Sequence, residues 1–396
     1  MWFAFVAAGF AVLIASGIYV RRRVAAALAL VGVGPRAIRI IRWLIVWLLF
    51  GAPILMVIAI VASLLLGREV LPRFDGMVAS TVLMVPFAWS VLVVIQSVVW
   101  IVAIDVGHLL ARRRRPRIRA LATLAVVAVL ALYTPARIVA ELGDLRVRHH
   151  QLGAATTGAR PFRIAFLADI QQDVHTDADR ARDVYELVNA AQPDVVLSGG
   201  DWINSGPDHI ESAAATAALL HSRLGTFSVR GDHEHFAYVD RERSIAEIER
   251  AMHAHGIAML NNEVRWFEHN TKRIAVAFLN YNYIYRSDRA TIERLVASLA
   301  GADYAIAVTH QLDGALADLL ADRVDLVLAG HTHGGQVNPV LGLWHVNLAR
   351  LETSFVDGRY ALGSRTTIIV TAGVGTSIVP LRYAAPGSIE LIELRL

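Results

Sequence analysis

Apolar residues are concentrated in the first 140 positions of this 396-residue chain. Several stretches there approach the roughly 20 consecutive apolar residues that a helix needs to cross a bilayer. The third stretch is longer than a crossing requires, so we expect it to tilt or to bend near Pro86. The pattern predicts a transmembrane region over residues 1–140 with four helices, at Trp2–Val20, Trp43–Leu66, about Met77–Ile104 and Leu121–Ala136.

The pattern changes after residue 140. Residues 141–161 are polar and contain several glycines, which predicts a juxtamembrane linker with a short strand at Leu145–His149. Over residues 162–396, short apolar runs typical of strands alternate with segments of helical period. This alternation predicts an α/β domain with a largely parallel sheet. Its helices are expected at Asp177–Ala191, His209–Ser222, Ser244–Ala254, Thr291–Leu299 and Gln311–Leu320.

Other strand-like runs of this domain have few helices between them. We assign these runs to a second sheet, and the roughly 235 residues available are ample for one such core. The runs are Val264–Glu268, Arg273–Leu279, Thr366–Val370 and Ile389–Leu394.

Charge changes how the apolar region is interpreted. The formal net charge of +4 comes mainly from arginines in two short loops, around Arg21–Arg23 and from Arg112 to Arg119. Basic clusters also occur in nucleic-acid-binding proteins. Because apolar spans flank both clusters, we interpret them as cytoplasmic loops beside anionic lipid headgroups and predict no nucleic-acid partner.

This charge pattern sets an orientation. If both arginine-rich loops lie in the cytoplasm, the domain over 162–396 is expected on the extracytoplasmic side of the membrane. In a bacterial cell this membrane would be the inner or plasma membrane. Arg21–Arg23 follow the first span, the reverse of a secretory signal peptide, so this span is expected to remain as an anchor. Pro135 and Arg137 end the fourth span early. If that span does not cross, the domain is cytoplasmic.

The chain contains no cysteine. This excludes disulfides, zinc–thiolate sites and cysteine nucleophiles. Chemistry at a site must therefore come from carboxylates, imidazoles, amides and hydroxyls.

Polar blocks follow the apolar runs at five places in the predicted domain. Donors at the carboxyl ends of strands in open α/β sheets converge in one crevice. Three carboxylates and several imidazoles in one crevice need divalent cations to offset charge repulsion and desolvation. The sequence therefore predicts a two-metal site, built from Asp169 with Gln171, Asp201, Asp232 with His233, His310, and His331 with His333.

These blocks resemble the calcineurin-like metallophosphoesterase superfamily in its membrane-anchored bacterial form. That pattern runs Asp-x-His, Gly-Asp, Gly-Asn-His-Asp/Glu, a lone His and Gly-His-x-His. The resemblance covers Arg163 to Leu396, and Gly-His-Thr-His-Gly-Gly-Gln at 330–336 is its most specific part. It implies a two-sheet αββα sandwich. Two positions depart from the pattern: Gln171 stands where a His is expected and Asp232 where an Asn is expected.

The resemblance also implies a role for each donor. It places Asp201 between two metals and makes His233 the general acid or transition-state stabiliser. Because the two departures remove an imidazole and add a carboxylate, we expect manganese or magnesium, with zinc or iron as the alternatives. One metal is assigned to Asp169, Gln171 and His333, and the other to Asp232, His310 and His331.

Several assignments have alternatives. Asp201 suits a turn or a helix cap, although the preceding Gly199-Gly200 permits close backbone approach. His331 and His333 are expected to alternate along an extended segment and so to share one face. If Gln171 is not a metal ligand, the nearby Asp173 or His175 is the alternative ligand. Other polar residues have ordinary loop, surface or ion-pair roles as alternatives to pocket roles: Glu234, His235, Asn261, Asn262, Asn280–Tyr285 and Arg382.

The predicted function is hydrolysis of a phosphate ester by a metal-bridging hydroxide. Phosphomonoesters, phosphodiesters and lipid-linked pyrophosphates share the reacting group, and the membrane location favours a lipid or envelope phosphate. The alternative is a membrane-anchored, non-catalytic binding protein for a phosphorylated ligand with a degenerate site. A transporter is disfavoured because the spans hold almost no charged residues.

Overall fold

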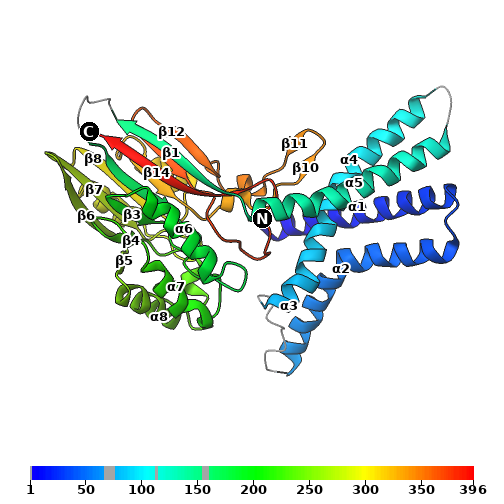
Figure 1. The fold of residues 1–396 in the computed structure, drawn as a ribbon, viewed down its shortest axis with the longest axis horizontal. Coiled ribbons are helices and arrows are strands. Elements are labelled where there is room, and N and C mark those ends of the chain that lie inside the picture. Colours follow the sequence, from blue (N-terminus) through cyan, green and yellow to red (C-terminus); the bar gives the residue numbers. More distant parts are fainter. Residues whose placement is uncertain (1, 67–75, 112–114, 154–159) are drawn as a thin grey trace. The chain divides into compact units, whose positions relative to one another are not determined.

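The computed structural model describes residues 2–66, 76–111, 115–153 and 160–396 (Figure 1). The chain divides into two compact units, which we call the helical unit and the sheet unit. The helical unit comprises Met1–Ala140 and two later segments, Val337–Val346 and Val379–Ala384. The sheet unit comprises Glu141–Gln336, Asn347–Ile378 and Ala385–Leu396.

Long apolar helices form most of the helical unit. Within the part of the chain that the structure describes, three helical stretches are long and apolar enough to cross a membrane: Pro35–Leu66, Met77–Leu110 and Pro116–Leu142. Inside the unit, Val20, Leu49 and Ile101 pack in one apolar cluster. Its helices are α1 (Trp2–Leu30), α2 (Pro35–Leu66), α3 (Met77–Ala79), the π-helical turn η1 (Ser80–Met84), α4 (Val85–Leu110) and α5 (Pro116–Leu142).

Prolines act differently in α4 and α5. The irregularity expected near Pro86 takes the form of the π-helical turn η1, and Pro86 itself stands in the first turn of α4, where a missing N–H is tolerated. The prediction that Pro135 ends the last span early was wrong, because α5 continues through it to Leu142. A proline inside an apolar helix removes one hydrogen bond without ending the helix when neighbouring groups compensate. Residues 67–75 and Arg112–Arg114 lie outside the described residues.

Gln96 of α4 fixes the two later segments within the helical unit. Its Oε1 accepts hydrogen bonds from the Tyr383 hydroxyl at 2.8 Å and from the Val340 N–H at 3.4 Å. Val340 belongs to a short hairpin, β10 (Val340–Leu341) and β11 (Trp344–His345). The sequence pattern predicts both segments within the α/β domain, whereas the structure places them in the helical unit.

The sheet unit contains two six-stranded sheets. The first has the order β1-β14-β2-β3-β4-β5 and the second β12-β13-β9-β8-β7-β6. Strands β2 to β5 run parallel, as do β7, β8, β9 and β13. The strands are β1 (Leu145–Gly153), β2 (Phe162–Leu167), β3 (Val195–Ser198), β4 (Thr226–Ser228), β5 (Ile257–Met259), β6 (Glu263–His269), β7 (Lys272–Leu279), β8 (Tyr304–Thr309), β9 (Leu326–Ala329), β12 (Gly358–Leu362), β13 (Thr366–Val370) and β14 (Gly387–Arg395).

Three apolar layers hold this unit together. Phe166 and Phe278 lie in the layer between the two sheets. Both faces of each sheet are apolar, so each sheet packs against the other sheet on one face and against helices on the other. Helices cover the two outer faces, so the unit is the expected αββα sandwich. The first face carries α6 (Ala178–Ala190), α7 (Ile210–Ala217) and α8 (Arg241–Ala254), and the second carries α9 (Arg289–Ala297) and α10 (Gly314–Leu320).

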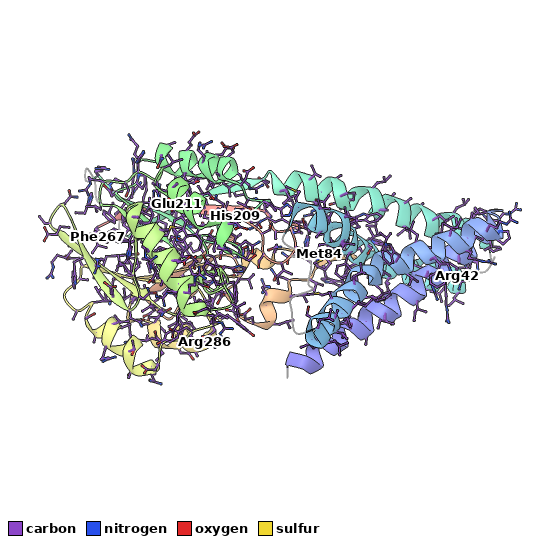
Figure 2. The ribbon with its side chains drawn as sticks, turned by 90° about the horizontal axis from the view of Figure 1, so that it is seen from below. Arg42, Met84, His209, Glu211, Phe267 and Arg286 are labelled. Atoms are coloured by element: carbon purple, nitrogen blue, oxygen red, sulfur yellow. The ribbon has the colours of Figure 1, made fainter. Side chains whose placement is uncertain are left out.

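Aspartates start most of these helices. The side chains of Asp177, Asp240, Asp288 and Asp313 accept hydrogen bonds from the first free N–H groups of α6, α8, α9 and α10. Helix α7 lacks such a cap and follows the short 3-10 helix η2 (Pro207–His209). Its Glu211, which is labelled in Figure 2, lies in the first turn of the helix. The Glu211 carboxylate pairs with His255 at 2.8 Å.

Strand β14 corrects one topological prediction. We had assigned Ile389–Leu394 to the second sheet, but β14 lies in the first sheet, parallel to β1 and antiparallel to β2 (Figure 1). The strand beginning at Leu145 extends to Gly153 and provides the edge partner for β14 over nine residue pairs. Residues 154–159 lie outside the described part of the chain.

Candidate metal centre

The carboxylates and imidazoles of the candidate centre come from different sheets. Asp169, Asp201 and Asp232 follow β2, β3 and β4 of the first sheet, whereas His310 and His331 follow β8 and β9 of the second. Since these strands are parallel within each sheet, their carboxyl ends meet at one edge of the sandwich. The structure therefore brings together residues spread over 160 positions of sequence.

His310 lies at the middle of this cluster. Its Nε2 is 3.2 Å from Asp232 Oδ2 and 3.5 Å from Asp201 Oδ2, and its Nδ1 is 4.0 Å from Asp169 Oδ1. Nδ1 also donates to the Gly199 carbonyl oxygen at 2.7 Å, and this hydrogen bond orients the ring so that Nε2 faces the carboxylates. Two groups have ligand atoms within 4.8 Å of one another: Asp232, His310 and His331, and Asp169, Asp201 and His310.

Backbone N–H groups hold the three carboxylates in place. The His331 N–H donates to Asp169 at 3.0 Å, the His233 N–H to Asp201 at 2.8 Å, and the Tyr283 N–H to Asp232 at 2.6 Å. In each pair the donor belongs to a different loop from the acceptor. The loops therefore fix one another, which orients the carboxylates without using the imidazoles.

Most of the predicted ligands have an unusual backbone conformation. Side chains other than glycine rarely adopt a positive φ, and such strain concentrates at functional sites. The φ angles are 53° at Asp169, 47° at Gln171, 60° at Asp201, 72° at His331 and 50° at His333.

Glycine is required where the loops approach each other. A Cβ on Gly231 would lie 2.2 Å from Asp201 Oδ1 and 2.8 Å from His310 Nδ1. A Cβ on Gly200 would lie 2.4 Å from the Gly231 nitrogen, and Gly200 has a positive φ of 88°. Only glycine lets Asp201 and Asp232 approach this closely.

Gln171 lies in the same cluster. Its Nε2 donates to Asp201 Oδ2 at 3.2 Å, while its fully buried Oε1 has no hydrogen-bond partner among the described residues. A buried amide oxygen without a partner is costly unless something else binds it, and it is a suitable donor for a hard cation. Asp173, considered as a substitute, instead accepts from the N–H groups of His175 and Thr176 and from Asn204.

The two histidines of the 330–336 block face different partners. His331 Nδ1 lies 2.8 Å from Asp232 Oδ2, whereas His333 Nε2 lies 4.0 Å from Asp169 Oδ1. The prediction of an extended segment was wrong, because His333–Gly335 form the 3-10 helix η4 after a helical Thr332. The tight turn, and not strand alternation, brings both imidazoles to the cluster.

His233 is next to the cluster and partly exposed. Its Nδ1 contacts the Asn204 carbonyl oxygen, and its Nε2 lies 4.0 Å from Asp201 Oδ2 and 3.2 Å from Ser377 Oγ. The Phe236 ring packs edge-on against the imidazole, with 5.5 Å between ring centroids. These contacts hold Nε2 between Asp201 and Ser377.

Residues 162–335 match the family model of the calcineurin-like phosphoesterases. These residues are a calcineurin-like phosphoesterase domain. An uncharacterized metallophosphoesterase of Campylobacter jejuni is 29% identical over 236 residues, 60% of each chain. A transmembrane protein with metallophosphoesterase domain of Danio rerio is 26% identical over 290 residues, 69% of this chain and 62% of that protein. The solved NAD nucleotidase of Haemophilus influenzae aligns with a TM-score of 0.40 at 13% identity, over 55% of this chain and 46% of that one.

The chain thus spans about 60% of the length of the two curated relatives. The stretch of this chain that aligns with each relative is longer than residues 162–335. The similarity to both relatives therefore extends beyond the residues that match the family model. The family of the phosphoesterase domain implies divalent metal ions.

The electrostatics of the candidate centre fit cation binding. Burial raises the pKa of Asp169 to about 6. Burial also raises the pKa of Asp232, but His310 and His331 outweigh it and hold that pKa well below its usual range. Burial lowers the pKa of His310, but Asp201 and Asp232 raise it well above its ordinary value. Without metal, protonated imidazoles therefore offset the carboxylate charge that bound cations would neutralise.

Two glutamates organise the site from outside the metal-ligand set. Buried Glu234 accepts from the backbone N–H groups of Asp201, Trp202 and Gly231, at 3.0, 2.8 and 2.6 Å. Glu352 Oε1 lies 3.1 Å from His331 Nε2. The sequence left the role of Glu234 undecided between a pocket residue and an ordinary surface residue, and it gave no indication of a role for Glu352. Glu352 lies in the irregular segment after the 3-10 helix η5 (Leu348–Leu351), which has no motif to identify it.

The weaker candidates are placed as follows. Tyr283 and Ile284 of the 280–285 segment donate backbone N–H groups to Asp232. Asn262 accepts from the Asn280 N–H and so supports that segment. Arg382 is fully buried within the helical unit.

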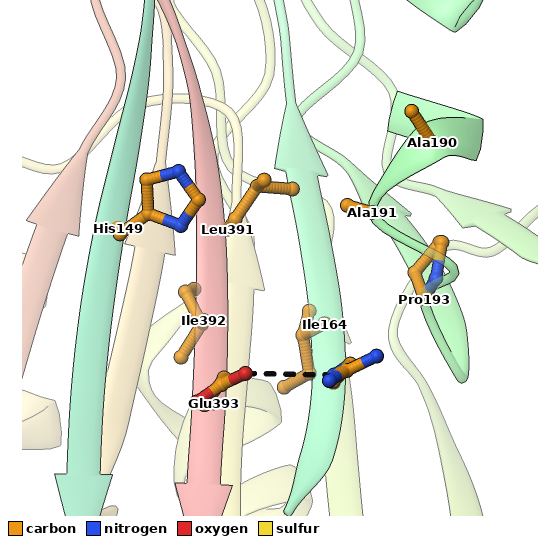
Figure 3. A pocket seen from close by; sticks show the side chains of 9 residues that line it. His149, Ile164, Ala190, Ala191, Pro193, Leu391, Ile392 and Glu393 are labelled. Carbon is orange, nitrogen blue, oxygen red and sulfur yellow. Dashed lines mark ion pairs between the residues drawn. The ribbon is translucent and has the colours of Figure 1, made fainter. Parts of the chain in front are cut away.

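A hollow of about 280 Å³ lies apart from this centre, beside β1, β14 and β2 (Figure 3). His149, Ile164, Leu391 and Glu393 line it, and Arg163 pairs with Glu393 at 3.4 Å across it. It contains none of the candidate ligands. Donor chemistry, and not the size of a hollow, identifies the site.

Proposed function

We propose that this protein is a membrane-anchored, metal-dependent phosphoesterase that hydrolyses a phosphate ester at the centre described above. The convergence of three carboxylates with the imidazoles of His310 and His331 is the observation that supports it. The match of residues 162–335 to the phosphoesterase family agrees with this chemistry.

The proposed ligand set divides between two cations. Asp169, Gln171 and His333 would hold one, Asp232, His310 and His331 the other, and Asp201 would lie between them. The Oε1 of Gln171 and the 2.8 Å contact of Asp232 with His331 support this division. When bound, two divalent cations lower the pKa of water and neutralise charge on the phosphoryl group.

The remaining chemistry belongs to His233. Its Nδ1–H donates to the Asn204 carbonyl oxygen, which orients the ring and leaves Nε2 to carry the exchangeable proton. Protonated Nε2 would give that proton to the leaving oxygen as the phosphorus–oxygen bond breaks. General acid catalysis of this kind typically contributes about 10²- to 10⁴-fold.

Manganese or magnesium is the proposed metal. An amide oxygen at position 171 and a carboxylate at position 232 form a harder donor set than the family pattern supplies. Metal analysis of protein purified without added metal tests this assignment. Two tightly held zinc or iron ions per chain would contradict it.

The domain is proposed to lie on the extracytoplasmic side of the membrane, in a bacterium the inner or plasma membrane. The arginines at positions 21–23, which lie within α1, and those between positions 112 and 119 in the sequence support that orientation through the positive-inside rule. A reporter that is active only in the cytoplasm, fused after Leu396, should remain inactive. An active reporter would place the domain in the cytoplasm.

The decisive experiment is a hydrolysis screen on the full-length protein in detergent. Aryl phosphate mono- and diesters are supplied with Mn²⁺ or Mg²⁺, and wild type is compared with His233→Ala. We expect the variant to lose activity by about 10²- to 10⁴-fold while remaining folded. The exposed His221 provides a matched control, His221→Ala, which should keep full activity.

Other outcomes would change the proposal. Full activity in His233→Ala would remove this residue from the mechanism. Absence of hydrolysis by the wild type, with retained metal-dependent binding of phosphate, would favour the non-catalytic binding protein instead.

A further inference from the structure

Exposed apolar side chains gather in the loops next to the phosphoesterase site. Four of them are Phe236, Tyr283, Leu351 and Ile378, with exposed fractions of 40, 59, 60 and 88%. Val239, Tyr285 and Leu348 are exposed in the same loops. The other exposed large apolar residues that the structure describes in the sheet unit are Leu187, Leu219 and Trp266, none more than 45% exposed.

Each of the first four residues lies in a loop that contacts a proposed ligand or His233. Phe236 packs on the His233 ring, and the Tyr283 N–H donates to Asp232. Leu351 precedes Glu352, whose Oε1 contacts His331. Ile378 follows Ser377, whose Oγ contacts His233 Nε2. We call Phe236, Tyr283, Leu351 and Ile378 the apolar rim.

Ile378 adds an independent observation. Its φ is 65°, a conformation in which a β-branched residue is strained, and 88% of its side chain is exposed. Asparagine or glycine would relieve the strain, so neither folding nor solubility explains an isoleucine here. Strain combined with an exposed apolar side chain beside a reactive group points to a contact made with a ligand.

We infer that the site takes amphiphilic phosphate esters, in which the alcohol part is a hydrocarbon chain. This inference rests on the proposed function and specifies its substrate class. The phosphate would sit among the ligands, and the rim would cover the first carbons of the chain. A rim whose members each belong to a loop that contacts the catalytic centre fits the substrate itself better than a separate partner surface.

The reaction at such a substrate balances as ordinary hydrolysis. Water forms a new bond to phosphorus and releases one proton to the solvent, and the bond from phosphorus to the alcohol oxygen breaks. That oxygen leaves with the proton from His233 Nε2. The products are the long-chain alcohol and a phosphate with one ester bond fewer.

The test is a chain-length series on the full-length protein in detergent with Mn²⁺. Butyl and octyl phosphate, and the butyl and octyl esters of 4-nitrophenyl phosphate, cover mono- and diester hydrolysis. We expect kcat/KM for octyl to exceed that for butyl by at least about tenfold, since partial burial of four added methylenes suffices for that ratio. A ratio near one in the wild type would overturn the inference while leaving the proposed function intact.

Rim variants separate recognition by the protein from partitioning into detergent. Ile378→Asn and Leu351→Ser should bring the octyl-to-butyl ratio down toward one, and asparagine at 378 suits the positive φ. Leu187→Ser, on the exposed face of α6, is the matched control and should keep the wild-type ratio. Wild-type ratios in both rim variants would also overturn the inference.

Binding covers the case in which no substrate is turned over. Octylphosphonate should then bind the Mn²⁺-loaded protein at least about tenfold more tightly than butylphosphonate, and Ile378→Asn should remove the difference. Equal binding of the two phosphonates would reject the amphiphilic ligand. Absence of turnover with this difference retained would reject only the proposed catalysis.

Discussion

The first sheet of the phosphoesterase domain contributes carboxylates to the candidate centre, whereas the second contributes imidazoles. Asp169, Asp201 and Asp232 follow strands of one sheet, and His310 and His331 follow strands of the other. Both sets sit at parallel strand ends, yet each alone would be unstable in a buried place. The carboxylates repel one another, and the imidazoles lose hydration. Packing one sheet on the other is therefore what assembles a neutralised site.

Breaking the carboxylate side should have the largest effect. Asp201→Asn removes the charge that faces both His310 and His233, at 3.5 and 4.0 Å, while keeping the side-chain shape. We expect a loss of about 10⁴-fold in kcat with Mn²⁺, because the residue would lie between both cations. Steady-state kinetics measure it, and circular dichroism checks the fold. Asp208→Asn, outside the cluster, is the control, and full activity in Asp201→Asn would reject the bridging role.

Proton competition at the imidazole side should come next. Burial lowers the pKa of His331, but hydrogen bonds with Asp232 and Glu352 raise it to about 9 from 6.5. In the metal-free protein this pairing stabilises the fold fully below pH 6.5, and the contribution is lost as pH rises through about 9. A cation requires neutral His331, so the affinity for Mn²⁺ should rise about 100-fold between these pH values.

Thermal unfolding measures this competition. The increase in Tm produced by Mn²⁺ should be larger near pH 9 than at pH 6.5, under anaerobic conditions. An increase independent of pH would show that His331 does not exchange a proton for the cation.

Glu352→Ala should have a smaller effect on the same side. Glu352 holds His331 Nε2 at 3.1 Å and thereby directs Nδ1 toward Asp232. Loss of such a supporting partner typically costs about 10- to 100-fold in metal affinity. Isothermal titration with Mn²⁺ measures it, and Glu352→Gln, which keeps an acceptor, should recover most of the affinity. Equal losses in both variants would mean that charge, and not orientation, is what Glu352 provides.

Gln171→His sharpens the comparison with the smallest expected change. It puts an imidazole on the carboxylate side, where the family pattern has one. We expect about tenfold tighter zinc binding relative to manganese, because imidazole suits zinc better than an amide oxygen does. Competition titrations measure the ratio. Gln172→His is the matched control, since Gln172 hydrogen-bonds Ser212 instead of Asp201, and a shift there too would show a non-specific effect.

The donors of the centre could be predicted because each follows a short apolar strand. Strand ends are visible in sequence, and parallel strands carry their ends to one edge. The resemblance then paired each block with a metal. The geometry of His331 and His333 could not be predicted in this way, since a 3-10 turn with positive φ places them where an extended segment had been expected.

Other features depend on contacts between distant parts of the chain. Glu352 reaches His331 from an irregular segment, and β14 joins the first sheet because β1 offers it a nine-residue edge. Pro135 did not end α5, although proline usually does so in water-exposed helices. Tertiary packing determines which distant segments contact one another, and local sequence patterns do not contain this information.

The division of the chain has a practical consequence for anyone wishing to isolate the sheet unit. The polypeptide passes from one unit to the other at residues 140/141, 336/337, 346/347, 378/379 and 384/385. One protease cut at 140/141 would leave the other four passages joined, so it should nick the molecule without releasing a fragment. A truncated gene starting at β2 would still encode the segments Val337–Val346 and Val379–Ala384 of the helical unit. These segments would lack Gln96, the residue to which they hydrogen-bond. Biochemistry on this protein is therefore best begun with the intact polypeptide in detergent or nanodiscs.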